Sequence, residues 1–221
     1  MNLFHQYLGS YPEIELRVMN VKYPLGASKI LVEQITGDTF NEHANEIGVI
    51  VNNVSTIYNI YRTLRYNRPI TEKIITVTGD LVDNPENVLI KIGMKANNLI
   101  SSLELPTKEG LQVIDGGVII GRSYVDYNLV LMPTTIGLTI KNQENFKAST
   151  CFNCGKCNAS CPMQVTVSVA LKALAKKQSK YYARCGANKC IGCGLCSYVC
   201  PAKINLKNTV LTVKKEIAHE K

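Results

Sequence analysis

The sequence has 221 residues, of which 46% are hydrophobic and 19% charged, and it contains nine cysteines and no tryptophan. No stretch approaches the roughly 18 uninterrupted apolar residues that a membrane-spanning helix needs, and residues 1–10 lack the basic and apolar regions of a secretory signal. The composition therefore favours a soluble intracellular protein of two or three small domains, whose clustered cysteines bind metal rather than form disulfides.

The net charge of +8 is unevenly distributed along the chain. Residues 1–140 hold 11 Lys and Arg against 14 Asp and Glu, whereas residues 141–221 hold 14 against 3. A basic segment raises the possibility of nucleic-acid binding, but there is no recognisable nucleic-acid module, and few aromatic residues lie among the lysines for bases to stack on. We therefore expect no nucleic-acid partner and predict an acidic protein partner for the basic segment.

The first seventy residues predict a β-α-β-α pattern. Apolar runs at residues 14–21 and 48–51 are typical of strands. Residues 27–35 and 55–65 have apolar side chains at helical spacing, with Ser55 as the expected cap of the second helix.

From residue 71 to residue 140 the pattern changes to short β runs separated by turn residues. One helix, residues 96–103, lies among the strands, which we expect at residues 74–77, 88–92, 111–114 and 129–131. Strands around a single helix at this length predict a small β-grasp-like domain. Residues 141–150 are polar and predict a linker.

The cysteines that follow form two copies of the motif C-x2-C-x2-C-x3-C-P. The copies begin at Cys151 and at Cys190 and comprise Cys151, Cys154, Cys157 and Cys161, then Cys190, Cys193, Cys196 and Cys200. Three thiolates spaced by two residues wrap a tight loop around one face of an iron-sulfur cube, and backbone N–H groups then offset the charge on the sulfurs. This spacing predicts two 4Fe-4S clusters and one-electron transfer between protein partners.

The fourth cysteine of each copy lies beyond the loop and, in two-cluster ferredoxins, ligates the other cluster. The predicted ligands are therefore Cys151, Cys154, Cys157 and Cys200 for the first cluster, and Cys190, Cys193, Cys196 and Cys161 for the second. Zinc also takes four cysteines at CxxC spacing, but a zinc ribbon gives no reason for a third cysteine at the same spacing and a fourth before proline. An amphipathic helix is expected between the motifs at residues 167–174. Cys185 lies outside both motifs and is interpreted as a buried or idle thiol, with a spare ligand or redox sensor as the alternative.

The chain resembles the RnfC family, the peripheral subunit of the Rnf ferredoxin:NAD+ oxidoreductase complex, over nearly its whole length. The resemblance rests on the order of several short stretches, namely Tyr23-Pro24-Leu25-Gly26, residues 51–56 (VNNVST), 76–80 (TVTGD), 84–88 (NPENV), 116–121 (GGVIIG) and the cysteine octet.

The resemblance implies an α+β chain in four parts. Residues 1–70 would be the end of a Rossmann-like α/β domain that binds FMN and NADH, 71–140 an SLBB β-grasp domain, 141–205 a small α-rich ferredoxin-like domain with two clusters, and 206–221 a C-terminal helical tail. Asn52 and Asn53 would contact FMN, although helix capping explains the same pair. The family's glycine-rich phosphate loop is absent from the sequence, and Ser28 replaces an acidic residue of the family. Both departures argue against FMN or NADH binding by this chain alone.

Three functions remain open at this point. The first is an electron-transfer subunit of an Rnf-type complex, cytoplasmic and peripheral on the membrane, whose partners are other Rnf-type subunits and an acidic ferredoxin or flavoprotein. The second is a soluble RnfC-like adaptor that serves another reductase. The third is a metal-stabilised interaction module without a redox role. None of them makes the chain a complete enzyme by itself.

Overall fold

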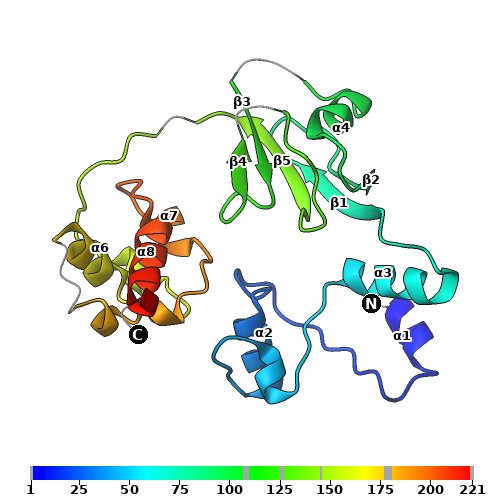
Figure 1. Ribbon diagram of the computed structural model, residues 1–221, viewed down its shortest axis with the longest axis horizontal. Coiled ribbons are helices and arrows are strands. Elements are labelled where there is room, and N and C mark those ends of the chain that lie inside the picture. The colour runs from blue at the N-terminus through cyan, green and yellow to red at the C-terminus, as the bar shows by residue number, and fades with distance from the viewer. Residues whose placement is uncertain (1, 107–109, 125–126, 145, 177–180, 220–221) are drawn as a thin grey trace. The chain divides into compact units, whose positions relative to one another are not determined.

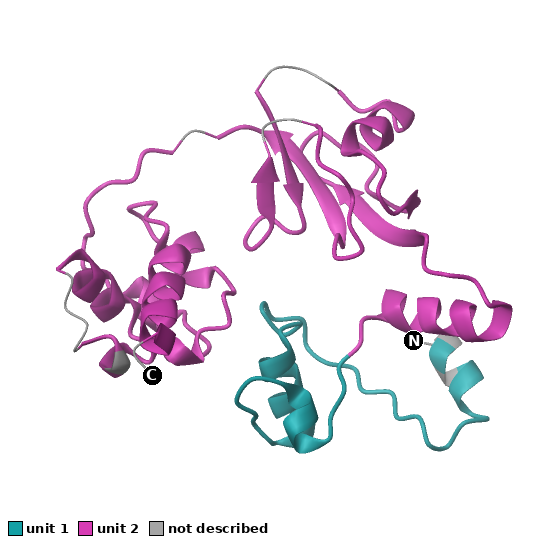
Figure 2. Ribbon diagram, viewed as in Figure 1, with its two compact units in different colours: residues 1–51 teal, residues 52–221 magenta. Residues whose placement is uncertain are grey.

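The computed structural model describes residues 2–106, 110–124, 127–144, 146–176 and 181–219 (Figure 1). The chain divides into two compact units, Met1–Val51 and Asn52–Lys221 (Figure 2). None of the helices in the described part of the chain combines the length and the apolar character needed to cross a bilayer.

The first unit contains helices α1 (Asn2–Leu8) and α2 (Ser28–Thr36) and the 3-10 helix η1 (Ala44–Ile47). Helix α2 confirms the helix predicted at residues 27–35. The two strands predicted at residues 14–21 and 48–51 are wrong, since both segments are irregular. Val18 and Val21 are largely exposed. A strand forms only where a neighbouring strand accepts its hydrogen bonds, and sequence pattern alone does not supply that neighbour.

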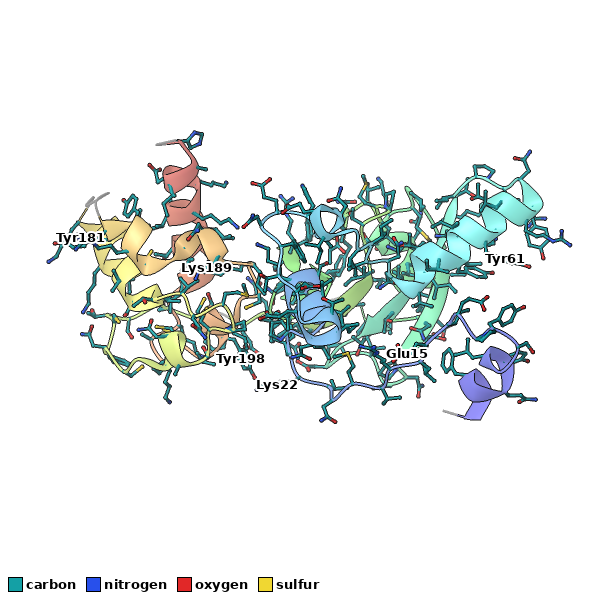
Figure 3. All side chains as sticks on the ribbon, turned by 90° about the horizontal axis from the view of Figure 1, so that it is seen from below. Glu15, Lys22, Tyr61, Tyr181, Lys189 and Tyr198 are labelled. Carbon is teal, nitrogen blue, oxygen red and sulfur yellow. The ribbon has the colours of Figure 1, made fainter. Side chains whose placement is uncertain are left out.

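The second unit begins with helix α3 (Val54–Tyr66), which confirms the helix predicted at residues 55–65. Its cap is Asn53 and not Ser55, because the Asn53 side chain accepts a hydrogen bond of 2.9 Å from the Ser55 backbone N–H. No residue of α3 is buried. Tyr61 packs edge-on against Tyr66 with 5.8 Å between ring centroids, and Figure 3 shows Tyr61 on this helix.

A five-stranded mixed sheet follows, in the order β2-β1-β5-β3-β4. Strands β1 and β5 are parallel and the other neighbours are antiparallel. The elements are β1 (Glu72–Thr78), β2 (Glu86–Lys91), α4 (Ala96–Ser102), β3 (Leu111–Asp115), β4 (Arg122–Tyr124) and β5 (Gly137–Asn142). The first three predicted strands and the helix are confirmed, and β4 and β5 were missed. The strand expected at residues 129–131 is wrong, because this segment makes only an isolated bridge from Val130 to Lys95.

The sheet buries one face against α4. In β1 the side chains of Ile75 and Val77 are 1% exposed, whereas Ile74, on the other face, is 44% exposed. Helix α4 contributes Leu99 and Ile100 to the same core. Burying a side chain of this size stabilises the fold by roughly 1.5–3 kcal/mol. Because side chains alternate between the two faces along β1, the face that carries Ile75 and Val77 is the one that α4 covers.

The cysteine-rich part is helical and has a second core. It contains α5 (Lys156–Ala159), α6 (Val167–Ala175), η3 (Ala183–Cys185), η4 (Ala187–Lys189), α7 (Leu195–Tyr198) and α8 (Leu206–His219). Helices α6 and α8 pack together, as Figure 1 shows, and bury Val167, Ala170, Val210 and Val213. Helix α8 falls where a C-terminal helical tail was expected, but its buried face makes it half of this core. Helix α6 confirms the helix predicted between the motifs.

Candidate metal centre

The two cysteine motifs fold into two copies of the same backbone. The first copy starts at Cys151 and the second at Cys190, 39 residues later, and α6 and α8 begin at matching positions. In both copies the backbone has positive φ at three matching positions, which are Asn153, Gly155 and Gln164 in the first and Gly192, Gly194 and Lys203 in the second. The sequence repeat is therefore also a repeat of conformation.

The first loop turn of each copy directs a backbone N–H at a sulfur. The N–H of Asn153 donates to Cys151 Sγ at 3.5 Å, and the N–H of Gly192 donates to Cys190 Sγ at 3.4 Å. Val165 N–H similarly donates to Cys161 Sγ at 3.3 Å. Donors at sulfur stabilise negative charge there, which is the environment that a thiolate ligand requires.

Four of the predicted ligands line one cavity. The cavity contains Cys161 of the first copy together with Cys190, Cys193 and Cys196 of the second. The cavity itself measures about 20 Å³, and the space free of protein atoms in and around it is about 360 Å³, part of which is open solvent. Val165, Val167, Ile191 and Val210 are among the apolar residues that complete its wall. The chain thus brings together the crossed set of cysteines expected for the second cluster.

Three cysteines of the other predicted set, Cys151, Cys154 and Cys157, lie at the first loop. Cys157 lies close enough to Cys151 and Cys154 for their thiols to affect its pKa. Cys200 is buried, in the core against which Cys157 packs. Cys154 is exposed, so the first loop is more open to solvent than the cavity of the second.

Burial governs the electrostatics of these thiols. It raises the pKa of Cys196 to about 11 and also raises the pKa of Cys190 and of Cys157. Backbone donors, and for Cys190 the charge of Lys214, act in the opposite direction. Metal binding at buried thiols releases protons, because only the thiolate is a ligand.

The donor set fits an iron-sulfur cluster. Within the described ranges, no three His, Cys, Asp or Glu side chains converge closely enough to hold one metal ion. The four thiols of the second set line one cavity, and cysteine thiolates are the ligands of 4Fe-4S clusters. Soft thiolates are the donors that both iron-sulfur clusters and zinc prefer.

One pair of positioning residues was not apparent in the sequence. Asn158 directly follows the third cysteine of the first copy, and its side chain accepts from Ser168 N–H at 3.0 Å and donates to Ser168 Oγ at 2.9 Å. Ser197, at the matching position, accepts from Lys207 N–H at 2.8 Å. Each side chain fastens a cysteine loop to the first turn of the helix that follows. Thr166, the N-cap residue of α6, makes no such bond itself.

We expect Asn158→Ala to destabilise the chain by about 1 kcal/mol, the usual cost of removing a helix cap. Ser197→Ala should have a similar cost. Asn158→Ser, which introduces the residue of the other copy, should recover most of the loss. Urea unfolding followed by circular dichroism measures these differences, and an Asn158→Ser variant as unstable as Asn158→Ala would contradict the capping role.

The remaining candidate residues are not part of the cysteine loops. Cys185 is 1% exposed and its thiol donates to the Tyr182 carbonyl at 2.9 Å, so the structure places it in the core. Asn52 is exposed, and Asn53 caps α3 as described above. Capping, the alternative explanation for this pair, therefore accounts for Asn53.

Two known families match parts of the chain. A 4Fe-4S dicluster domain matches residues 150–204, and a Nuo51 FMN-binding domain matches residues 2–62. The first match coincides with the repeated loops, and the second covers α1, α2, η1 and most of α3.

Similar curated proteins carry related names. The chain is 31% identical to the C subunit of the ion-translocating oxidoreductase complex of Buchnera aphidicola, over 74% of this chain and 34% of that protein. It is 32% identical to the protein of the same name from Yersinia enterocolitica, over 68% of this chain and 22% of that protein. It is 31% identical to the C subunit of the Na(+)-translocating ferredoxin:NAD(+) oxidoreductase complex of Acetobacterium woodii, over 82% of this chain and 41% of that protein.

The matched region spans about a fifth to two fifths of the length of these relatives. The chain is thus a homologue of the RnfC proteins and corresponds to part of their length.

Proposed function

We propose that the chain is an electron-transfer subunit that carries two 4Fe-4S clusters and works within an Rnf-type complex. The observation that carries this proposal is the cavity in which Cys161 meets Cys190, Cys193 and Cys196. Cysteines from two motifs line one wall there, which is the arrangement of two-cluster ferredoxins. When bound, the clusters supply one-electron redox chemistry.

The chain's own residues have three roles in this proposal. Cys190, Cys193, Cys196 and Cys161 ligate the second cluster, and Cys151, Cys154, Cys157 and Cys200 the first. The backbone N–H groups of Asn153 and Gly192 stabilise charge on the first sulfur of each loop. Apolar side chains such as Val165 and Val210 limit the access of water to the second cluster.

We assign the sheet to an SLBB-type β-grasp domain and retain the divisions at residues 70 and 140, whereas α8 belongs with the cysteine-rich part because it shares that core. The strand order β2-β1-β5-β3-β4, the parallel β1 and β5, and helix α4 between β2 and β3 support the assignment. The sheet extends to Asn142, two residues into the predicted linker.

We also propose that the N-terminal segment takes part in flavin binding. The match of residues 2–62 to an FMN-binding domain favours it, whereas the missing glycine-rich loop argues against FMN on this chain alone. Because the Asn53 side chain is engaged in capping α3, Asn52 is the better candidate of the pair for contact with flavin.

The partners we propose are the other subunits of an Rnf-type complex and an acidic ferredoxin or flavoprotein. The basic segment supports an acidic partner; Lys189 at the end of η4, labelled in Figure 3, is one of its exposed cations. The names of the relatives support a place on an ion-translocating complex, and we propose peripheral attachment at the cytoplasmic face. A soluble adaptor for another reductase would use the same clusters and basic surface.

Metal analysis of anaerobically purified or reconstituted chain tests the proposal. We expect about eight iron and eight sulfide per chain, because each cluster holds four of each, and an EPR signal after reduction with dithionite. Stoichiometric zinc without sulfide would overturn the redox function and support a metal-stabilised interaction module instead. Titration with FMN, followed by quenching of flavin fluorescence, tests the flavin proposal in the same sample.

A further inference from the structure

Lys214 brings a positive charge to the second cysteine loop. Its Nζ donates a hydrogen bond of 2.8 Å to the carbonyl of Cys190, the first residue of that loop. The residue lies on α8, and its side chain is half-buried. The contact joins residues 24 positions apart, so the packing of α8 against the loop, and not local sequence, creates it.

The first copy of the repeat lacks this charge. Position 214 lies 24 residues after Cys190, and the position 24 residues after Cys151 is Ala175, the last residue of α6. A second lysine strengthens the difference, because Lys207 lines the cavity of the second loop and its counterpart is Ser168. The two loops therefore differ in the charge beside them, because the half-buried Lys214 contacts the second loop, whereas the first loop holds the exposed Lys156, whose counterpart is Leu195.

A nearby positive charge favours the reduced state of a cluster. Reduction adds one negative charge, and a cation close to it lowers the free energy of that state. The reduction potential of a cluster depends on such charges as well as on hydrogen bonds to sulfur and solvent exposure. Bulk salt screens a half-buried charge less than an exposed one, so Lys214 acts more strongly than the exposed lysines of the segment.

We propose that Lys214 is a tuning residue that raises the reduction potential of the cluster at Cys161, Cys190, Cys193 and Cys196 and leaves the potential of the other cluster nearly unchanged. In a singly reduced chain it biases the electron toward the second loop. With both clusters held by the chain, this bias would favour transfer of one electron from the first cluster to the second, with no proton transferred. The inference rests on the proposed function, since it presupposes both clusters.

The test is an EPR-monitored redox titration of the full chain with both clusters assembled. Lys214→Gln removes the charge and keeps an N–H donor of similar reach. We expect the reduction potential of one of the two one-electron couples to fall by about 59 mV. For a one-electron couple this corresponds to about a tenfold change in how the electron is distributed between the two clusters. The other couple should stay in place.

Two variants are matched controls. Lys214→Arg keeps the charge and should leave both couples near their wild-type positions. Lys215→Gln removes the same charge from the exposed neighbouring residue and should leave both couples nearly unchanged. Should Lys214→Gln assemble less than the full iron and sulfide, Lys214→Met removes the charge with a side chain of similar length.

The outcomes separate this inference from the proposed function. Wild-type chain without iron, sulfide or EPR signals would overturn the proposed function itself. Two intact clusters whose couples do not move in Lys214→Gln, or move together, would overturn the tuning role alone. An equal shift in Lys215→Gln would also overturn it, because the effect would then be that of general surface charge.

Discussion

Cys161→Ala and Cys193→Ala are expected to damage the same cluster, although they lie in different motifs, whereas Cys154→Ala should damage the other one. The reason is that Cys161 and Cys193 line one cavity, while Cys154 lies beside Cys157 in the first loop. Each variant should lose about half of the roughly eight irons expected for two clusters. EPR spectra of the reduced variants, recorded with iron counts, measure this pattern.

Cys185→Ala is the matched control for these variants. Its thiol is buried and donates to the Tyr182 carbonyl, so its loss should leave iron and sulfide unchanged and cost only packing energy. If each cluster were instead ligated by the four cysteines of a single motif, Cys161→Ala would leave the same EPR spectrum as Cys154→Ala. That result would contradict the ligand assignment, and iron loss in Cys185→Ala would reassign the ninth cysteine as a ligand.

Gly79→Ala should destabilise the sheet by about 3 kcal/mol or more. Gly79 has φ of +135°, and an added Cβ would lie 2.0 Å from the Ile140 carbonyl oxygen and 2.6 Å from its nitrogen. Both atoms belong to the backbone of β5, so no side-chain movement relieves the clash. The chain must either change φ at this position or separate β1 from β5.

Gly93→Ala provides the comparison for this variant. Gly93 also has positive φ, +90°, but a Cβ there meets nothing within 4 Å. Its replacement should therefore cost only the backbone strain, about 1–2 kcal/mol. Hydrogen exchange of the β1 and β5 amides in the full chain measures both effects, and equal loss of protection in the two variants would show that the clash with Ile140 is unimportant.

The elements predicted correctly from sequence are strands β1, β2 and β3 and four helices whose signal is local. Helices α2, α3, α4 and α6 follow from apolar spacing within a single segment. The wrong and missing strands are elements that depend on a partner strand, and helix α1 is also not predicted. The expected strands at residues 14–21 and 48–51 have strand-like composition and no ladder, and β5, which is central to the sheet, was interpreted in part as a linker.

The metal-binding hypothesis follows from local sequence alone, because each loop needs only three cysteines spaced by two residues and glycines that permit positive φ. It also predicted two crossed sets of cysteines, and the members of one set, Cys161, Cys190, Cys193 and Cys196, line one cavity. The surroundings of the loops follow from tertiary packing. They include the Asn158 and Ser197 caps and the contact of Lys214 with Cys190. These contacts join residues 10 to 24 positions apart. They depend on how α6 and α8 pack against the loops, which the spacing of neighbouring residues does not encode.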